Sequence, residues 1–165
     1  MLQYLTSGHV VWGTKDGACG ALTPAVIRKL SKWTQNRFYS KEAGGLMLGF
    51  VDSDTNGLLV EDLTVPGSGD QRSRTSFFRG ERHQREAELW NIQTNGRGTQ
   101  LGFWHTHPET NPTPSNTDIN DIESVLRNGK FECNGFLYLI VGTQTIGYWY
   151  AHTGQPLIFL GYLKP

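Results

Sequence analysis

Apolar and polar residues alternate with two different periods along the chain, and each period predicts one kind of element. Short apolar runs bounded by turn residues predict buried strands. The clearest are residues 45–51 and 58–65, joined by a turn at residues 52–57. Further strands are expected at residues 9–12, 75–78, 99–105, 135–142, 144–152 and 156–163.

Three other stretches repeat their apolar residues every three or four positions, which predicts helices. The first begins at Pro24, because proline is favoured at the first helical position. The second covers residues 81–93, and the third begins at Ser115 and runs to about residue 127. Strands outnumber helices and the two kinds are mixed. The sequence therefore predicts an α/β (mixed α+β) fold, with a curved mixed β-sheet flanked by helices.

Composition and charge narrow the classes of protein that this chain can represent. The 165 residues suit a single domain, residues 1–165. Fifteen basic and fifteen acidic residues cancel to a net charge of zero, which argues against binding of nucleic acid by bulk charge. No apolar run approaches the roughly 20 residues of a membrane span, and no signal peptide is visible. We therefore expect a cytoplasmic protein with no membrane or nucleic-acid partner.

The cysteines offer no metal site. Cys19 and Cys133 are the only two, they lie far apart in the sequence, and no Cys-x-x-Cys occurs. A disulfide between them stays open at this point. A bound metal would have to use histidine, aspartate or glutamate.

The sequence His105-Thr106-His107-Pro108 closes a predicted strand and carries the first candidate metal ligands. Side chains alternate along a strand, so His105 and His107 point to the same face. Pro108 ends the strand and leaves both imidazoles at the rim of the sheet. Two imidazoles aimed at one point suit a divalent metal. Because the pattern also occurs by chance, a histidine pair without a metal stays open.

Ser115 and Asp118 at the start of the third predicted helix allow two interpretations. Ser-x-x-acid is a capping box, which needs no further function. However, Asp118 precedes Ile122 by four positions and so lies on the face that turns inward, where a carboxylate needs a partner or a cation. Together with His105 and His107 it would supply three protein ligands and leave a fourth position for water, as catalytic zinc sites do.

Glu42 is the candidate general base. It begins the segment Glu-Ala-Gly-Gly-Leu-Met-Leu-Gly that leads into the most hydrophobic strand of the first half. The alternative is an exposed charge at the start of a strand.

Together these motifs resemble the JAB/MPN family, and within it the JAMM metalloprotease branch. The resemblance covers about residues 25–141 and includes Pro108 and the six-residue spacing from it to Ser115. It implies a JAB/MPN fold, similar to cytidine deaminase in the arrangement of sheet and helices. It also implies a Zn²⁺ ion held by His105, His107 and Asp118, with water as the fourth ligand.

The same resemblance implies roles for the two remaining residues. Glu42 would take a proton from the water and later deliver one to the leaving amine. Ser115 would hydrogen-bond the oxyanion of the tetrahedral intermediate. Ser115 would then have to divide its hydroxyl between this role and the helix cap.

Residues 73–79, His83-Gln84, Trp90 and residues 102–109 resemble the prokaryotic arm of the family. That arm includes the deconjugating isopeptidases of bacterial antiphage systems known as CBASS. The resemblance implies a zinc-dependent isopeptidase that cuts the bond after the C-terminus of a conjugated protein. Its partner would be a protein with an extended C-terminal tail, such as a cGAS-like nucleotidyltransferase joined to a target.

Other functions stay open or are excluded on motifs. The same hydrolase could instead process a bacterial ubiquitin-like or sulfur-carrier protein or a small metabolite, and a non-catalytic MPN scaffold is a further alternative. A zinc nucleobase deaminase would need Pro-Cys-x-x-Cys, and a thermolysin-like protease would need His-Glu-x-x-His. Neither motif occurs in the sequence.

Two surface features accompany these motifs. Five arginines crowd one short segment, and they could hold the acidic tail of a partner or form a solvated face. They are Arg72, Arg74, Arg79, Arg82 and Arg85. His83, among them, is expected at the surface. Substrate recognition is expected from the loops at residues 66–79 and 109–114.

Overall fold

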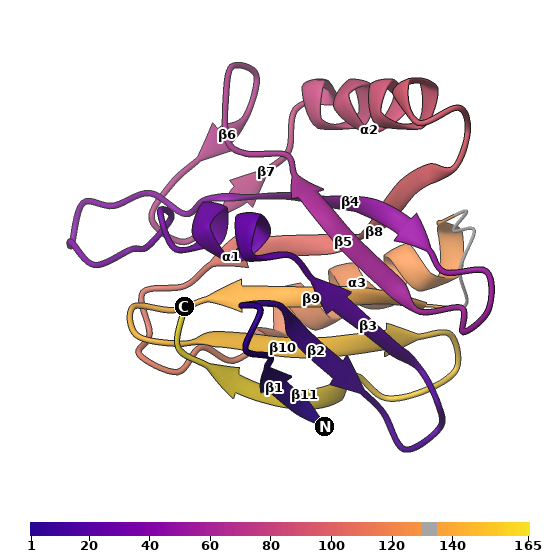
Figure 1. Cartoon of the computed structure of the whole chain (residues 1–165). Helices are drawn as coiled ribbons and strands as arrows, with labels where there is room; N and C mark the ends of the chain where they lie inside the picture. Colours follow the sequence, from indigo (N-terminus) through magenta and orange to yellow (C-terminus); the bar gives the residue numbers. More distant parts are fainter. Residues whose placement is uncertain (130–134) are drawn as a thin grey trace.

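The computed structural model describes residues 1–129 and 135–165, which form a curved nine-stranded sheet, a two-stranded ribbon and three helices (Figure 1). The order of the large sheet is β1-β2-β3-β5-β4-β8-β9-β10-β11. Its strands are β1 (Leu2–Tyr4), β2 (Val10–Gly13), β3 (Cys19–Leu22), β4 (Gly44–Val51), β5 (Leu58–Leu63), β8 (Gly98–Thr106), β9 (Gly135–Val141), β10 (Ile146–His152) and β11 (Ile158–Leu163). The ribbon pairs β6 (Gln71–Arg72) with β7 (Phe77–Phe78), and the helices are α1 (Pro24–Leu30), α2 (Glu81–Gln93) and α3 (Asn116–Asn128).

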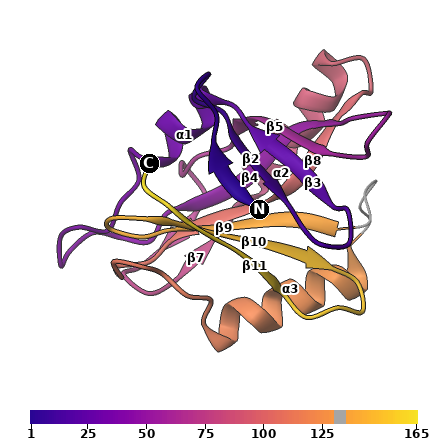
Figure 2. The same cartoon turned by 60° about the horizontal axis from the view of Figure 1, so that its bottom comes forward.

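The large sheet curves until its two edge strands approach each other (Figure 2). Most neighbouring strands are antiparallel, but β3 pairs with β5 and β8 with β9 in parallel. At the seam, the hydroxyl of Tyr4 donates a 2.7 Å hydrogen bond to the carbonyl of Lys164. This curvature encloses one side of the sheet as the main core.

Both faces of the central strands are buried, which explains their nearly continuous apolar sequence. Along β9, Leu137, Leu139 and Val141 join the core cluster that contains helix α1. The alternate residues Phe136 and Ile140 join a second cluster with α3 on the opposite face. Helix α2 covers that same opposite face over β4, where Ala87 packs with Leu46 and Leu48. Helices α2 and α3 thus both cover the outer face of the sheet, and α1 lies on its inner face.

The structure confirms the predicted mixed fold and most of its long elements. Helix α2 covers the predicted residues 81–93, and Thr23 and Ser115 cap the other two helices as their sequences suggest. Strands β1, β3 and β6 were not predicted, because two to four residues are too few to show a period. Strand β11 begins at Ile158, two residues later than predicted.

Two further expectations concern cysteine and membranes. Cys19 is a free thiol at the start of β3, whereas Cys133 lies outside the described residues. Among the described helices, none has the length and apolar character that a membrane crossing requires.

Candidate active site

The end of β8 brings the two histidines of the His-Thr-His motif together. The Nε2 atoms of His105 and His107 lie 2.9 Å apart. Thr106 between them points the other way and is buried, where its hydroxyl accepts from the Ala43 amide at 2.9 Å and donates to the Gln35 side chain at 2.8 Å. The buried threonine therefore ties the end of β8 to the residue that follows Glu42.

The first turn of α3 delivers Asp118 to the same point. Its Oδ1 lies 3.2 Å from His105 Nε2, and its Oδ2 lies 3.4 Å from His107 Nε2. Behind Asp118, Ile122 is buried against the sheet, as the inward face of the predicted helix required. The capping box is also formed, since Asp118 Oδ2 accepts from the Ser115 amide at 2.7 Å. The capping box is therefore present, and the same carboxylate also lies close to both histidines.

Glu42 stands at the edge of this group, immediately before β4. Its side chain is buried, and its Oε1 lies 4.0 Å from His105 Nε2. Burial raises the pKa of Glu42 from 4.5 to about 7, although the nearby His107 lowers it in part. A carboxylate of this pKa can hold or release a proton near neutral pH, as a general acid and base must.

Burial and the contacts between Asp118 and the two histidines shift the pKa values of all three side chains. Burial alone would raise the pKa of Asp118, but hydrogen bonds from His105 and His107 lower it far below its usual range. Burial lowers the pKa of His105, so its imidazole is neutral at physiological pH. For His107, the opposing effect of burial is outweighed by Asp118, and the pKa is raised.

The donor set fits a divalent metal. Zinc at its usual bond lengths of about 2.0–2.2 Å places tetrahedral ligand atoms roughly 3.3 Å apart. The three closest separations here are 2.9, 3.2 and 3.4 Å, among His105, His107 and Asp118. Glu42 can also form a three-residue group with the histidines, in which all ligand atoms lie within 4.8 Å. Glu42 Oε1 lies 4.0 Å from His105 Nε2, whereas Asp118 Oδ1 lies 3.2 Å from the same nitrogen. A water molecule therefore has more room beside Glu42 than beside Asp118.

The hydroxyl of Ser115 is engaged in this structure. Its Oγ accepts from the Asp118 amide at 3.1 Å and donates to Asp118 Oδ2 at 2.7 Å. The Ser115 hydroxyl is therefore already used by the helix cap and by Asp118, and an oxyanion would compete with Asp118 for its hydrogen. A substrate oxyanion would have to draw the hydroxyl hydrogen away from Asp118.

A small pocket of about 70 Å³ opens beside Glu42, His105 and Asp118, and one of its residues was missed by sequence reasoning. Tyr138 of β9 is buried with its ring centroid 5.4 Å from that of His105. Burial and the neighbouring Asp118 raise the pKa of its hydroxyl well above the usual value. The hydroxyl therefore stays protonated and bonds to Asp118. Nothing in the sequence around Tyr138 distinguishes it from other core aromatic residues.

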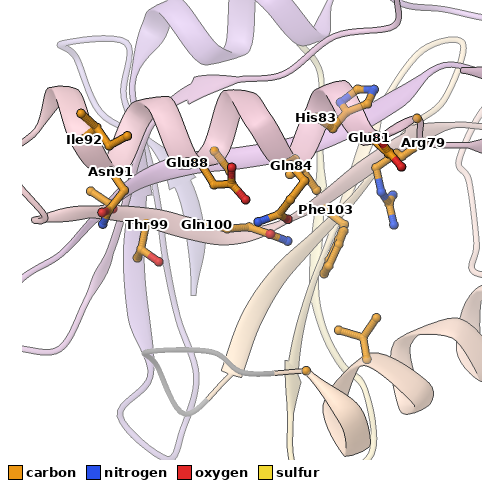
Figure 3. Close-up of a pocket in the computed structure, with 16 residues that line it drawn as sticks. Arg79, Glu81, His83, Gln84, Glu88, Asn91, Ile92, Thr99, Gln100 and Phe103 are labelled. Carbon is orange, nitrogen blue, oxygen red and sulfur yellow. The ribbon is translucent and has the colours of Figure 1, made fainter. Parts of the chain in front are cut away.

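A wider groove of about 920 Å³ lies between α2, β8 and α3 and was also not predicted (Figure 3). Gln84 and Glu88 of α2 and Gln100 of β8 line it, as labelled in the figure. Phe103 lines both this groove and the small pocket at the site. The groove therefore leads along the outer face of the sheet toward the histidines.

His83 corrects one expectation from the sequence. It is 1% exposed and lies in a buried chain of hydrogen bonds rather than at the surface. Its Nδ1 lies 2.5 Å from Thr64 Oγ1, and its Nε2 lies 3.0 Å from Asp70 Oδ2. Asp70 in turn accepts from the amides of Gly67 and Gly80. A single histidine in a charged helical sequence gives no sign of partners 13 and 19 positions earlier in the chain.

Comparisons with known proteins identify the family of this chain. Residues 23–153 match the family described as prokaryotic homologues of the JAB domain. A Vibrio cholerae protein named CD-NTase/cGAS isopeptidase is 32% identical over 134 residues, 81% of each chain. Proteins of the same name from Escherichia coli and Pseudomonas aeruginosa are 37% and 44% identical over 57% and 48% of this chain. Those two matches span only 60% and 50% of the relatives' own lengths.

One solved structure supports the fold. A solution structure of a protein from Desulfitobacterium hafniense aligns with a TM-score of 0.53 at 22% identity, covering 87% of this chain and 88% of the other. At this identity the match concerns the fold alone.

Proposed function

The chain belongs to the family of prokaryotic homologues of the JAB domain, and from that premise we propose that it is a zinc-dependent isopeptidase. In this proposal it hydrolyses the bond that joins the C-terminus of one protein to another protein. One observation carries the proposal. Two imidazole nitrogens and a carboxylate lie at ligand spacing, and a buried glutamate with a pKa of about 7 lies 4.0 Å from one of them.

We assign His105, His107 and Asp118 as the residues that would hold zinc. Bound zinc acidifies water toward a pKa of about 7 and polarises a carbonyl, which makes amide hydrolysis feasible at neutral pH. The neutral imidazole of His105 and the ionised carboxylate of Asp118 are in the protonation states that metal ligands need.

Glu42 and Ser115 would act on the reacting groups. The carboxylate of Glu42 takes a proton from the attacking water and returns one to the leaving amine, a change that its pKa near 7 permits at small cost. The hydroxyl of Ser115 donates to the oxyanion once it leaves Asp118.

The shape around the site favours an extended chain as substrate. The groove between α2, β8 and α3 leads toward the histidines and is lined by amide side chains that can bond a peptide backbone. Strand β7 pairs only with β6 among the described residues, and its Phe77 lines the small pocket, so its other edge can align a chain by main-chain hydrogen bonds. We therefore propose that a flexible C-terminal tail is threaded to the site, with a lysine or α-amine as leaving group.

The names of the relatives suggest whose tail this is. Since the similar proteins are named CD-NTase/cGAS isopeptidases, we propose a cGAS-like nucleotidyltransferase as the conjugated protein, within an antiphage system. A bacterial ubiquitin-like or sulfur-carrier protein is the alternative substrate.

The test is a panel of fusions in which each candidate tail is joined through its C-terminus to a reporter protein. Cleavage sites are read by mass spectrometry, with a Glu42→Gln variant as the inactive control. We expect cleavage directly after the last residue of the nucleotidyltransferase. If only a carrier protein or a small amide is cut, the nucleotidyltransferase assignment fails and the zinc hydrolase assignment stands.

A further inference from the structure

The loop at residues 31–41 and the ribbon segment at residues 71–79 form one continuous surface beside the candidate site. The Gln35 side chain donates to the carbonyl of Arg74 at 2.8 Å. Arg74 in turn donates to the carbonyls of Arg37 and Phe38. The Glu42 amide donates to the carbonyl of Ser73 at 2.7 Å, which joins this surface to the proposed general base.

Two adjacent aromatic side chains project from this surface. Phe38 is 81% exposed and Tyr39 is 61% exposed, and their rings meet edge to face at 5.4 Å. Arg37 donates to the Tyr39 hydroxyl at 2.6 Å and lies over its ring. Aromatic side chains dominate binding energy at protein interfaces, and a loop already held by Arg74 loses little freedom on binding. The pair is therefore an anchor that the fold holds in place.

The charge around this anchor has one sign. The two segments contain six basic residues and no aspartate or glutamate: Lys32, Arg37, Lys41, Arg72, Arg74 and Arg79. Because the whole chain has a net charge of zero, this excess is local. In the part of the chain that the structure describes, none of the six forms an ion pair.

The arginine cluster of the sequence is thereby divided. Arg85 pairs with Glu81 at 2.9 Å on the exposed face of α2, whereas Arg82 is half-buried, pairs with Glu86 and bonds the Val65 carbonyl. Arg72 and Arg74 bond carbonyls of the loop at residues 31–41, and Arg79 lies over the ring of Phe103. We call Lys32, Arg37, Phe38, Tyr39, Lys41 and Arg74 the basic aromatic surface.

We propose that the basic aromatic surface binds an acidic segment with an exposed apolar side chain on the protein substrate, upstream of the tail that is cut. This inference rests on the proposed function, because it assigns the surface to the same substrate. Lysine and arginine side chains attract the acidic groups, and the two rings bury the apolar side chain. Since Glu42 directly follows the loop, a body docked here holds its tail close to the site.

Protein suits this surface better than single-stranded nucleic acid does. Bases stack on open aromatic faces, whereas Phe38 and Tyr39 turn an edge and a face to each other and Arg37 already lies over one ring. A protein held to nucleic acid by charge is also usually basic as a whole, and this chain is neutral.

The first test measures binding of labelled short peptides by fluorescence anisotropy. One peptide contains glutamate and phenylalanine, one contains lysine and phenylalanine, and one contains glutamate alone. We expect only the first to bind well, and Lys32→Glu/Arg37→Glu to weaken it at least about tenfold. The control variant is Lys15→Glu/Arg97→Glu, which makes the same charge change at exposed positions at the other end of the sheet. Phe38→Ala tests the apolar anchor without changing the charge.

The second test measures cleavage of a whole nucleotidyltransferase fused to a reporter, and of its tail alone fused to the same reporter. We expect Lys32→Glu/Arg37→Glu to raise KM for the whole fusion about tenfold, with kcat unchanged and the tail fusion unaffected. Equal losses on both substrates, peptide binding that ignores the variant, or tighter binding of a single-stranded oligonucleotide would each overturn the inference. If the peptides bind as expected but no fusion is cut, the proposed function fails and the surface stands as a site for an acidic protein.

Discussion

Asp118 contacts four side chains at once: Ser115, His105, His107 and Tyr138. One of its oxygens accepts from the Ser115 amide and hydroxyl, and its two oxygens lie 3.2 and 3.4 Å from the two histidines. A capping box alone needs only the contact with the N-cap residue. Asp118 must also stay ionised beside two imidazoles, and the hydrogen bonds that lower its pKa keep it so. The geometry therefore lets Asp118 cap the helix and still lie close enough to both histidines to share a metal with them.

The first prediction concerns metal content. Protein purified without added metal should contain one zinc ion per chain, and Asp118→Ala should lose most of it because only two imidazoles remain. Asn128→Ala, at the far end of the same helix, is the matched control. Elemental analysis gives the answer, and full zinc retention in a His105→Ala/His107→Ala variant would contradict the ligand assignment.

The second prediction concerns Glu42. The variant Glu42→Gln keeps the shape of the side chain but accepts no proton, so turnover should fall by about 10²–10⁴ while zinc stays bound. Near-normal turnover would mean that another group takes the proton.

The same variant has a stability signature in metal-free protein. The unfolded chain ionises Glu42 at its ordinary pKa of 4.5, whereas the folded chain keeps the proton up to a pH of about 7. The folded state therefore binds more protons between these two values, and its stability falls as the pH rises through this window. Glu42→Gln removes this loss. Its melting temperature relative to wild type should rise from pH 4.5 to 7 and level off above, and an equal difference at all pH values would contradict the raised pKa.

The third prediction separates the two roles of Ser115. Ser115→Ala should destabilise the protein by about 1 kcal/mol through loss of the cap. If its hydroxyl also reaches the oxyanion, kcat should fall by about 10²–10³. Ser115→Asp keeps a capping side chain but cannot donate to an oxyanion, so it should restore more stability than activity. Measurements of kcat and melting temperature on both variants separate the two roles. Unchanged kcat in both variants would mean that Ser115 acts only as a helix cap.

At the scale of elements, the ribbon β6–β7 depends on a buried chain of polar contacts. Asp70 precedes β6 and accepts from the amides at both ends of the ribbon segment, Gly67 and Gly80. His83 bonds Asp70 to Thr64, whose hydroxyl also accepts from the Leu46 amide at 2.7 Å. Every partner is satisfied if His83 Nε2 donates to Asp70 and Nδ1 accepts from Thr64. These buried hydrogen bonds therefore fix the ribbon to β4 and β5.

The fourth prediction concerns the hydrogen bonds that His83 makes with Asp70 and Thr64. His83→Leu removes one hydrogen-bond partner from the buried Asp70 carboxylate and one from the buried Thr64 hydroxyl, which should cost about 1–3 kcal/mol for each of them. Urea denaturation measures the loss, and limited proteolysis should first cut the ribbon segment at residues 66–80. His152→Leu is the control, because His152 is the last residue of β10, is not fully buried, and its Nδ1 bonds the carbonyl of the next residue, Thr153. A loss no larger than that of the control would mean that water replaces the missing contacts.

The elements differ in how far their sequence predicts them. Helix α2 and strand β9 repeat their pattern over seven or more residues, and each appears within one residue of its predicted bounds, whereas β10 begins two residues later than predicted. Strands β1 and β3 have no such pattern, because they are strands only through their pairing with β2 and β5.

The candidate site shows the same division. Its five residues could be predicted because each lies in a short motif, such as His-Thr-His or Ser-x-x-Asp. Their supports could not, since the partners lie far apart in the sequence. Thr106 bonds Gln35, 71 positions away, and Arg72 bonds the carbonyl of Glu42, 30 positions away.

At the scale of the whole molecule, the site joins three segments that only the sheet brings together. Glu42 precedes β4, the histidines end β8, and Asp118 begins α3. Strands β4 and β8 pair with Gly44 opposite His105, so their register sets the distance between base and ligands. The basic aromatic surface borders this end of the sheet, and the groove runs toward it from the start of β8, where Gly98 and Thr99 line it. The candidate catalytic residues are therefore gathered at one end of the fold.

The last prediction tests whether metal binding stabilises this end of the molecule alone. In the proposed function zinc would bind the folded chain, and it would then raise stability by mass action and reduce the local motion of its ligands. Hydrogen exchange of the metal-free protein, with and without added zinc, should therefore slow most at residues 42–44, 105–107 and 115–119. The turn at residues 14–18 lies at the other end of the sheet and should change least. The variant His105→Ala/His107→Ala should show no slowing at any of these sites. Slowing of the turn as strong as that of the first turn of α3 would contradict a metal site built only from these three segments.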